Sequence, residues 1–302
     1  MVELGVVHLV REKNGLAPFE KFLASYRSHP AGVAHDLVLI FKGFQPGVNT
    51  DQYDRLLTEV PHQRLYMSDH GLDLAPYFAA VQRFDYRYFC FLNSFSRILV
   101  ADWLSKLRHW IAAEGVGLVG ATGSYESFAT NYLERELTLD TLGPLARLQW
   151  RIKHILSDGN PQLVSLRLAV WILSSLGLAD PGRYFPPFPN YHIRTNAFMA
   201  SRETLLQIHV WRMLSKLSAF VFESGRNSLT NQILRLGLRP LVVTRTGEAF
   251  EKDRWHLSNT FRQSAQENLL VADNQTDAYE QASAEGRIRL SKQAWGPYAR
   301  PA

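Results

Sequence analysis

Short apolar runs alternate with longer amphipathic segments over the first 120 residues. The run at 5–10 is almost wholly apolar, as in a strand buried on both faces. Between residues 16 and 28, Phe19, Phe22, Leu23 and Tyr26 recur at helical spacing and predict a helix that packs by one side. The alternation continues, with strands expected at 36–41, 64–67, 87–92 and 117–120 and helices at 51–60, 74–82 and 100–114.

This order of elements predicts an α/β fold, with a mostly parallel sheet, right-handed crossovers and flanking helices. From residue 125 to about 181 the helical pattern dominates, which predicts a helical insertion. Its apolar stripe at 142–156 is accompanied by basic residues, so this helix either packs on the sheet or rests on a membrane or a lipid-linked acceptor. The apolar segment 163–178 contains Arg167 and is too short to span a bilayer.

Composition narrows the class of protein. The chain has 302 residues with 46% hydrophobic content, enough for a large core in one or two domains. Its formal charge of +5 suits an anionic ligand or an acidic membrane surface, but the basic residues are scattered, which argues against nucleic acid. Cys90, the single cysteine, excludes a disulfide framework and is expected in the core. The N-terminus has no signal-peptide pattern, so a cytoplasmic setting is expected.

Polar, small and cationic residues follow the predicted strands. The carboxyl ends of parallel strands meet at one edge of a sheet, where such folds bind ligands. Closely approachable backbone amides with positive charge nearby suit a nucleotide diphosphate, although polar residues also end strands in almost any fold. The polar residues at these strand ends include Arg11, Lys13, Lys42, Asp73, Asn93, Ser94, Ser96 and Arg97.

Two later segments also contain candidate functional residues. In 191–203, polar His192, Arg194 and Asn196 partly alternate with apolar residues, which indicates either a strand that presents donors to a pocket or residues that satisfy backbone groups. In 222–243, Glu223 is predicted at the start of a helix that ends at Gly237. A carboxylate held there suits a general base, although it would also favour the helix dipole.

The order of these segments resembles that of glycosyltransferases of the GT-A fold. More narrowly, Phe91-Leu92-Asn93-Ser94 and Gly117-Leu118-Val119-Gly120-Ala121 resemble polysaccharide-building proteins related to rhamnan synthesis protein F. The resemblance spans roughly residues 1–245 and implies a Rossmann-like sheet. Within one continuous domain it implies a donor-binding half (1–124), the helical insertion (125–185), and an acceptor and catalytic half with a C-terminal tail (186–302).

The resemblance implies transfer of a sugar from a nucleotide-sugar to a hydroxyl of a polysaccharide or glycolipid acceptor, with inversion. In family-2-like members a Glu-Asp pair supplies the base, and this pair matches Glu223-Ser224, so that Glu223 is the expected base. The residues that the resemblance implies for donor binding are His8, Val10, Arg11, Lys42, Asp73, Asn93, Ser94, Ser96 and Arg97. Those implied for binding of the donor sugar or the acceptor are His192, Arg194 and Asn196.

One departure from the family concerns metal. The family's Asp-x-Asp motif corresponds to Asn93-Ser94-Phe95-Ser96, which has no carboxylate for magnesium or manganese. We therefore expect no metal cofactor, with cations stabilising the leaving diphosphate. Alternatively, Asp73 or Asp273, with His256, binds a manganese or magnesium ion. The candidate cations are Lys13, Arg97, Arg194, Arg245 and Arg262.

Other interpretations remain open. Loss of Asp-x-Asp and of the second acid of the Glu-Asp pair favours a catalytically degenerate protein that binds a carbohydrate or a partner. A nucleotidyltransferase would need carboxylates for two metals and a glycine-rich basic loop, which 11–15 matches sparsely. Peripheral association with the inner face of a membrane is compatible with the expected acceptors. The segment 268–279 either closes over the donor or forms a capping turn before a final helix.

Overall fold

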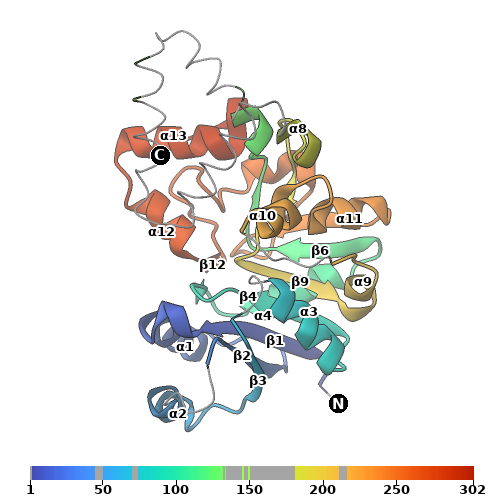
Figure 1. Cartoon of the computed structure of the whole chain (residues 1–302), viewed down its shortest axis with the longest axis vertical. Helices are drawn as coiled ribbons and strands as arrows, with labels where there is room; N and C mark the ends of the chain where they lie inside the picture. The colour runs from blue at the N-terminus through green and yellow to red at the C-terminus, as the bar shows by residue number, and fades with distance from the viewer. Residues whose placement is uncertain are drawn as a thin grey trace.

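The computed structural model in Figure 1 describes residues 2–44, 50–69, 74–131, 181–210 and 216–302, together with Leu133, Leu145 and Gln149. The statements below concern these residues. Asp73 and most of the predicted helical insertion, including the stripe at 142–156, lie outside them.

A central sheet has the strand order β11-β10-β6-β9-β4-β1-β2-β3 (Figure 1). Its N-terminal strands are β1 (Leu4–Arg11), β2 (Asp36–Lys42), β3 (Gln63–Met67) and β4 (Tyr88–Leu92). The others are β6 (Val116–Gly120), β9 (Ala197–Ser201), β10 (Arg239–Val243) and β11 (Ala249–Phe250). Parallel ladders join β3, β2, β1 and β4, and a further one joins β6 to β10. The predicted α/β fold with a mostly parallel sheet is confirmed.

β9 runs against both of its neighbours. It pairs in antiparallel fashion with β4 and with β6, and these two strands are joined through it. Because of this reversal, β9 begins at the edge of the sheet where β4 and β6 end. The residues just before Ala197 therefore lie beside the carboxyl ends of β4 and β6.

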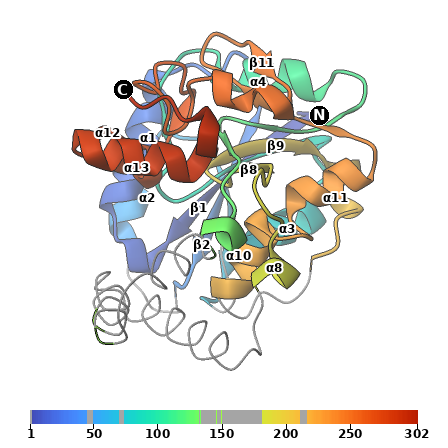
Figure 2. The same ribbon diagram turned by 90° about the horizontal axis from the view of Figure 1, so that it is seen from above.

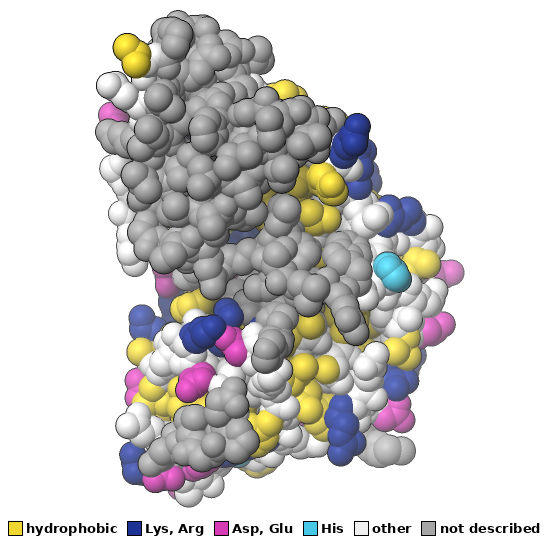
Figure 3. All heavy atoms as spheres, in the orientation of Figure 1, with side chains coloured by type: hydrophobic (Ala, Val, Ile, Leu, Met, Phe, Trp, Pro, Cys, Tyr) yellow, Lys and Arg dark blue, Asp and Glu magenta, His cyan; other side chains and the backbone are white. Residues whose placement is uncertain are grey.

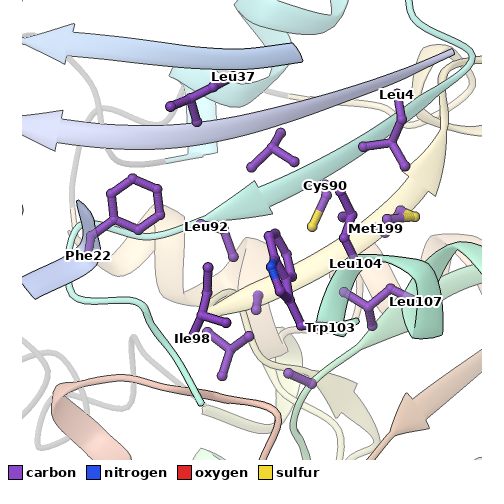
Figure 4. Close-up of a cluster of buried hydrophobic side chains, with 14 of the residues drawn as sticks. Leu4, Phe22, Leu37, Cys90, Leu92, Ile98, Trp103, Leu104, Leu107 and Met199 are labelled. Atoms are coloured by element: carbon purple, nitrogen blue, oxygen red, sulfur yellow. The ribbon is translucent and has the colours of Figure 1, made fainter. Parts of the chain in front are cut away.

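Helices cover both faces of the sheet, because the strands are apolar on both sides. On one face, Phe22 of α1 and Trp103, Leu104 and Leu107 of α4 pack in a cluster that includes the predicted core residue Cys90 (Figure 4). The helices with buried residues on this face are α1 (Ala17–Ser28), α2 (Asp51–Leu57) and α4 (Trp103–Ile111). Those on the other face are α3 (Leu74–Arg83), α9 (Arg202–Leu206), α10 (Lys216–Ser224), α11 (Leu229–Arg235) and the C-terminal end of α13 (Ala284–Trp295).

The C-terminal segment returns to the carboxyl edge of the sheet. Its strand β12 (Val271–Ala272) pairs with β5 (Arg97–Ile98), which follows β4. It continues into α12 (Asn274–Glu280) and α13 (Ala284–Trp295), which lie toward the α1 side of the molecule (Figure 1, Figure 2). The shorter elements are β7 (Gly123–Ser124), β8 (His192–Ile193), α8 (Pro181–Tyr184), η1 (Glu12–Asn14), η2 (Lys252–Leu257) and η3 (Gly296–Tyr298).

Three local predictions can be compared with the structure. Asp273 caps α12 through a capping box with Thr276, so the capping interpretation of 268–279 is confirmed. The capped helix is not the final one, because α13 follows it. The strand expected as one alternative within 191–203 is interrupted, because β8 ends at Ile193 and a turn precedes β9. The helix start expected at Glu223 is also wrong: Glu223 lies in the last turn of α10, and Ser228 caps the next helix, α11.

His8 is a buried histidine on the α1 face of β1. Its ring stacks on Phe22 with a centroid distance of 3.6 Å, and within the described residues neither ring nitrogen has a hydrogen-bond partner. Burial lowers the pKa of His8 to about 3. The side chain is therefore a neutral core residue in the folded protein, and it does not point to a ligand.

Replacing His8 by Leu is expected to raise the free energy of unfolding at pH 7 by about 1–3 kcal/mol, because two unsatisfied buried nitrogens are removed. The unfolded chain takes up a proton below the ordinary pKa of 6.5, whereas the folded chain resists it until about pH 3. In the wild type, His8 thus costs about 1.4 kcal/mol of stability per pH unit as the pH falls through this window. Urea unfolding at pH 7 and pH 5 measures both effects.

The exposed His109 on α4 provides the control, since His109→Gln removes a histidine outside the core and should unfold with the same free energy as the wild type at pH 7. Parallel pH slopes for wild type and His8→Leu would contradict the assignment.

Candidate functional site

The candidate site lies at the carboxyl edge of the sheet. Residues 194–196, here called the 194–196 turn, lead into β9 at this edge. The backbone amide of Asn93, after β4, donates to the carbonyl of Asn196 at 3.2 Å. After β6, the amide of Ala121 donates to the carbonyl of Ala197 at 2.9 Å. The turn is thereby fixed between the ends of β4 and β6.

The first feature of the site is the carboxylate of Glu223. Its Oε1 accepts a hydrogen bond from Thr195 Oγ1 at 2.8 Å, and the residue is half-buried. The end of α10 is anchored as well, because Asn190 Nδ2 donates to the carbonyl of Ser224 at 2.6 Å. A partly exposed carboxylate oriented by a hydroxyl on a fixed turn has the features of a positioned general base.

Asn196 is the centre of a buried polar network. Its carbonyl accepts from Ser96 Oγ at 2.6 Å, and its Oδ1 accepts from Thr122 Oγ1 at 2.5 Å. Its Nδ2 donates to the carbonyl of Val271 at 3.1 Å. The side chain of Asn196 therefore links the end of β6 to the C-terminal strand β12, and its backbone carbonyl adds the segment after β4. Asn196 is buried, so its role in this structure is to hold the site together.

The segment expected to bind the donor forms a tight turn after β4. Asn93 Oδ1 accepts from the amide of Phe95 at 2.9 Å and from Ser96 Oγ at 3.1 Å. Ser94 and Ser96 are buried. These side chains shape the strand end, and Asn93 directs its carboxamide oxygen into the turn.

Arg194 and Asp273 form a largely buried ion pair. Arg194 Nη2 lies 3.0 Å from Asp273 Oδ2, and the carboxylate is 2% exposed. The other oxygen, Oδ1, accepts from the amides of Gln275 and Thr276 at 3.1 and 3.0 Å. Asp273 therefore fixes Arg194 and caps α12 at the same time, which connects the C-terminal segment to the 194–196 turn.

A second arginine contacts the same aromatic ring as the first, and we call Arg194 and Arg262 the arginine pair. Both guanidinium carbons lie near the Phe261 ring, at 4.0 Å for Arg194 and 4.8 Å for Arg262 from its centroid. Arg262 Nη2 donates to Gln275 Oε1 at 2.7 Å, and its Nη1 lies 3.7 Å from Glu126 Oε2. Guanidinium groups recognise phosphate and carboxylate oxygens by charge-assisted hydrogen bonds, and here each of the two faces a carboxylate of the protein.

The other predicted cations have local partners. Arg11, at the end of β1, contacts Asp69 at 3.2 Å, and Lys13 contacts the same carboxylate. Arg97 pairs with Asp277 of α12 at 2.8 Å. Lys42 is buried at the end of β2, and Arg245 is exposed and donates to the carbonyl of Glu267 at 3.3 Å.

Two other candidates, like His8, are buried. Val10 belongs to the hydrophobic core. His192 Nδ1 lies 2.9 Å from the carbonyl of Asn190, and burial lowers the pKa of His192 to about 4, which keeps the ring neutral. Of the residues selected from the sequence, the structure brings Glu223, Arg194, Asn196, Ser96, Asn93 and Arg262 into connected networks.

Sequence reasoning missed several members of the site: Thr122, Glu126, Thr195 and Phe261. Thr195 stands between two selected residues, and that position was the only available signal for it. The others join the site through contacts with distant parts of the chain, which leave no local pattern.

The described residues do not fit a divalent metal. They contain no group of three or more His, Cys, Asp or Glu arranged to hold one. Both oxygens of Asp273 are engaged as described above, and His256 stacks on Tyr298 with a centroid distance of 4.5 Å. Asn93 is committed to its turn. We therefore derive no step through a metal.

Two cavities lie at the opposite edge of the sheet. One, of about 540 Å³, borders the starts of β4 and β6 and the end of β9, near Tyr88, Val116 and Ser201. The other, of about 530 Å³, borders the starts of β2 and β3, near Asp36 and Gln63. Neither is lined by the 194–196 turn.

On the face seen in Figure 3, the described Lys and Arg side chains are spread among acidic and apolar ones, in agreement with the scattered charge of the sequence. None of the helices in the described ranges has the length and apolar character needed to cross a membrane.

No protein family model matches the chain, and no curated protein is similar to it in sequence. Similar solved structures include the mannosyltransferase PcManGT from Pyrobaculum calidifontis in complex with GDP-Man and Mn2+, at 14% identity and a TM-score of 0.33. The match covers 39% of this chain and 35% of that one. S. aureus TarS 1–349 matches at 11% identity and a TM-score of 0.32, over 39% and 34% of the two chains. GalNAc-T7 with UDP, GalNAc and Mn2+ matches at 15% and 0.32, over 40% and 23%. The matched region thus spans about a third or less of each of these structures.

Proposed function

We propose that this protein is a glycosyltransferase of the GT-A fold, which moves a sugar from a nucleotide-sugar to a hydroxyl of a polysaccharide or glycolipid acceptor with inversion. The main support is that the 194–196 turn holds both a carboxylate and a cation: Thr195 bonds Glu223, and the adjacent Arg194 belongs to the arginine pair. Thr195 and Arg194 are neighbours in the chain, so their Cα atoms are about 3.8 Å apart, and the turn contacts the base through one residue and supplies a cation through the next. It lies at the edge where sheets of this kind bind ligands.

In this mechanism Glu223 accepts the proton of the acceptor hydroxyl. The acceptor oxygen forms a bond to the anomeric carbon as the bond between that carbon and the diphosphate oxygen breaks. The electron pair leaves with the nucleoside diphosphate, whose growing negative charge is stabilised by Arg194 and Arg262. Thr195 keeps the carboxylate oriented throughout.

The strand ends of residues 1–124 would bind the donor, with the partly exposed Arg11 and Arg97 and the turn after Asn93 among the contacting groups. The half from 186 onward would supply the base and shape the acceptor site. His192 and Asn196 are both buried, so they would support the acceptor site through the packing beneath its surface. The proposed acceptor places the reaction on the cytoplasmic side, at the inner face of a membrane.

The reaction is expected to proceed without added metal, because the cations take over the stabilisation of the diphosphate. Transfer measured with EDTA present should retain most of the rate seen without it. A rate that falls to background with EDTA and returns with manganese would contradict this prediction.

The proposal is tested by thermal unfolding with a panel of nucleoside diphosphates and nucleotide-sugars, including GDP-mannose and UDP-sugars, followed by transfer assays with the donor that binds. A ligand present at 100 times its Kd stabilises the folded state by about 2.7 kcal/mol. Binding followed by turnover supports a transferase. Binding of a saccharide without any turnover would favour the degenerate binding protein.

A further inference from the structure

Arg262 is held in an unusual state. Its backbone is left-handed, with φ of 47°, which side chains other than glycine rarely adopt. The side chain is 9% exposed, and its buried Nε has no hydrogen-bond partner among the described residues. Its Nη1 and Nη2 face Glu126 and Gln275, so the guanidinium is buried with only part of its donors paired among the described residues.

The two ion pairs of the site differ in how firmly they are built. Asp273 contacts Arg194 at 3.0 Å, is 2% exposed and also caps α12. Glu126 lies farther from Arg262, at 3.7 Å, and its side chain is 26% exposed. The carboxylate of Asp273 is thus part of the framework, whereas that of Glu126 has a longer contact with its arginine and is partly exposed to solvent.

The charges of the site balance in the absence of a ligand. Two guanidinium groups face two carboxylates, so a diphosphate gains little net attraction unless one carboxylate loses its charge or moves away. Glu126 is the carboxylate that can lose its charge or move, because its side chain does not cap a helix as that of Asp273 does. Its main chain is fixed at the same time, since Ser124 Oγ accepts from its amide at 3.1 Å and Asn190 Nδ2 donates to its carbonyl at 3.1 Å.

The surroundings of Glu126 favour its neutral form once a bound anion compensates the charges of Arg194 and Arg262. Burial raises its pKa, and the positive charges of Arg262 and Arg194 oppose that rise, as does a hydrogen bond from Gln293 of α13. The exposed Arg289 of α13 adds positive charge near Arg262. An incoming phosphate cancels the arginine charges and adds its own negative charge, so it favours protonation of the carboxyl.

We propose that Glu126 is an exchangeable counter-ion of Arg262, which a diphosphate displaces, and that the displaced carboxylate takes up a proton from solvent. This rests on the proposed function, since it concerns the anion site of the donor. Its consequence is that binding of the donor's diphosphate weakens as the pH rises.

Isothermal titration calorimetry with inorganic pyrophosphate tests the proposal independently of nucleotide and sugar. Titrations at one pH in buffers of different ionisation enthalpy give the protons exchanged per ligand bound. The ligand titrates too, but equally for wild type and variant, so the difference between them is the measure. Wild type is expected to take up more protons than Glu126→Gln, by up to one. Glu126→Gln is expected to bind about tenfold tighter at pH 8, because the competing charge is gone.

Glu285→Gln removes an exposed glutamate from the first turn of α13 and should match the wild type in both quantities. Arg262→Met, which removes the cation, should weaken pyrophosphate binding at least tenfold.

Equal affinity and equal proton uptake in wild type and Glu126→Gln would overturn the proposal, as would binding to neither protein. Because the transfer assay tests the proposed function separately, an active enzyme without proton linkage would refute the counter-ion alone.

Discussion

Glu223→Gln is expected to lower the rate of sugar transfer by about 100-fold or more while leaving the Kd of the donor unchanged. The amide keeps the size and hydrogen-bonding ability of the side chain, so Thr195 Oγ1 still has an oxygen to which it donates. What is lost is the capacity to accept the acceptor's proton. Turnover at saturating donor and acceptor measures the rate, and thermal stabilisation by the donor measures binding.

Glu248→Gln serves as the matched control, because Glu248 is an exposed glutamate beyond β10 and should leave the rate unchanged. Thr195→Val is expected to give a smaller loss than Glu223→Gln, since the carboxylate remains but is less firmly oriented. A Glu223→Gln protein with the wild-type rate would remove this residue from the mechanism.

Asp273→Ala is expected to destabilise the protein by about 3–5 kcal/mol, because Arg194 would be left with a largely buried, unpaired charge. The variant also removes the cap of α12, which adds about 1 kcal/mol. Asp273→Asn separates the two contributions, since the amide oxygen can still accept from the amides of Gln275 and Thr276. Urea unfolding of both variants gives the two free energies.

Asp277→Asn is the control for this pair of variants. Asp277 pairs with Arg97, and both side chains are more than a third exposed, at 36% and 38%. An exposed pair of this kind contributes at most about 1 kcal/mol. Equal losses for Asp277→Asn and Asp273→Ala would show that burial of the Arg194 pair contributes no extra stability.

The elements of the N-terminal half could be predicted because each leaves a local pattern. β1 and β2 are continuous apolar runs, and α1 has apolar residues at helical spacing. The end of α11 was also readable, since Gly237 adopts a left-handed conformation that glycine tolerates best. Such signals lie within a few residues of the feature that they predict.

The sequence pattern predicts one helix that begins near Glu223, whereas the structure has two helices with a break between them. Gly225-Arg226-Asn227 separates two helices, and Ser228 caps the second one through the amide of Asn231. A Cβ at Gly225 would come within 2.4 Å of the carbonyl oxygen of Val221, so glycine is required at this break. A run of break-forming residues before a serine was the available signal.

The polar networks of the site could not be predicted from the sequence. Arg194 and Asp273 are separated by 79 residues, and Thr122 and Asn196 by 74, so their contacts depend on the completed sheet. His8 shows the same limit for burial: nothing in its neighbourhood along the chain distinguishes a histidine packed on Phe22 from one that faces a ligand.

The reversed strand β9 also limits which fragments of the chain could fold alone. β4 and β6 are joined only through β9 in the central sheet, and β6 has its other ladder with β10. A fragment that ends at residue 124 would contain β6 without either of its hydrogen-bonding neighbours, although β1, β2, β3 and β4 could still pair. The proposed donor-binding half is therefore a functional region and not an independent folding unit, because the chain must reach β9 and β10 before β6 is hydrogen-bonded on both sides.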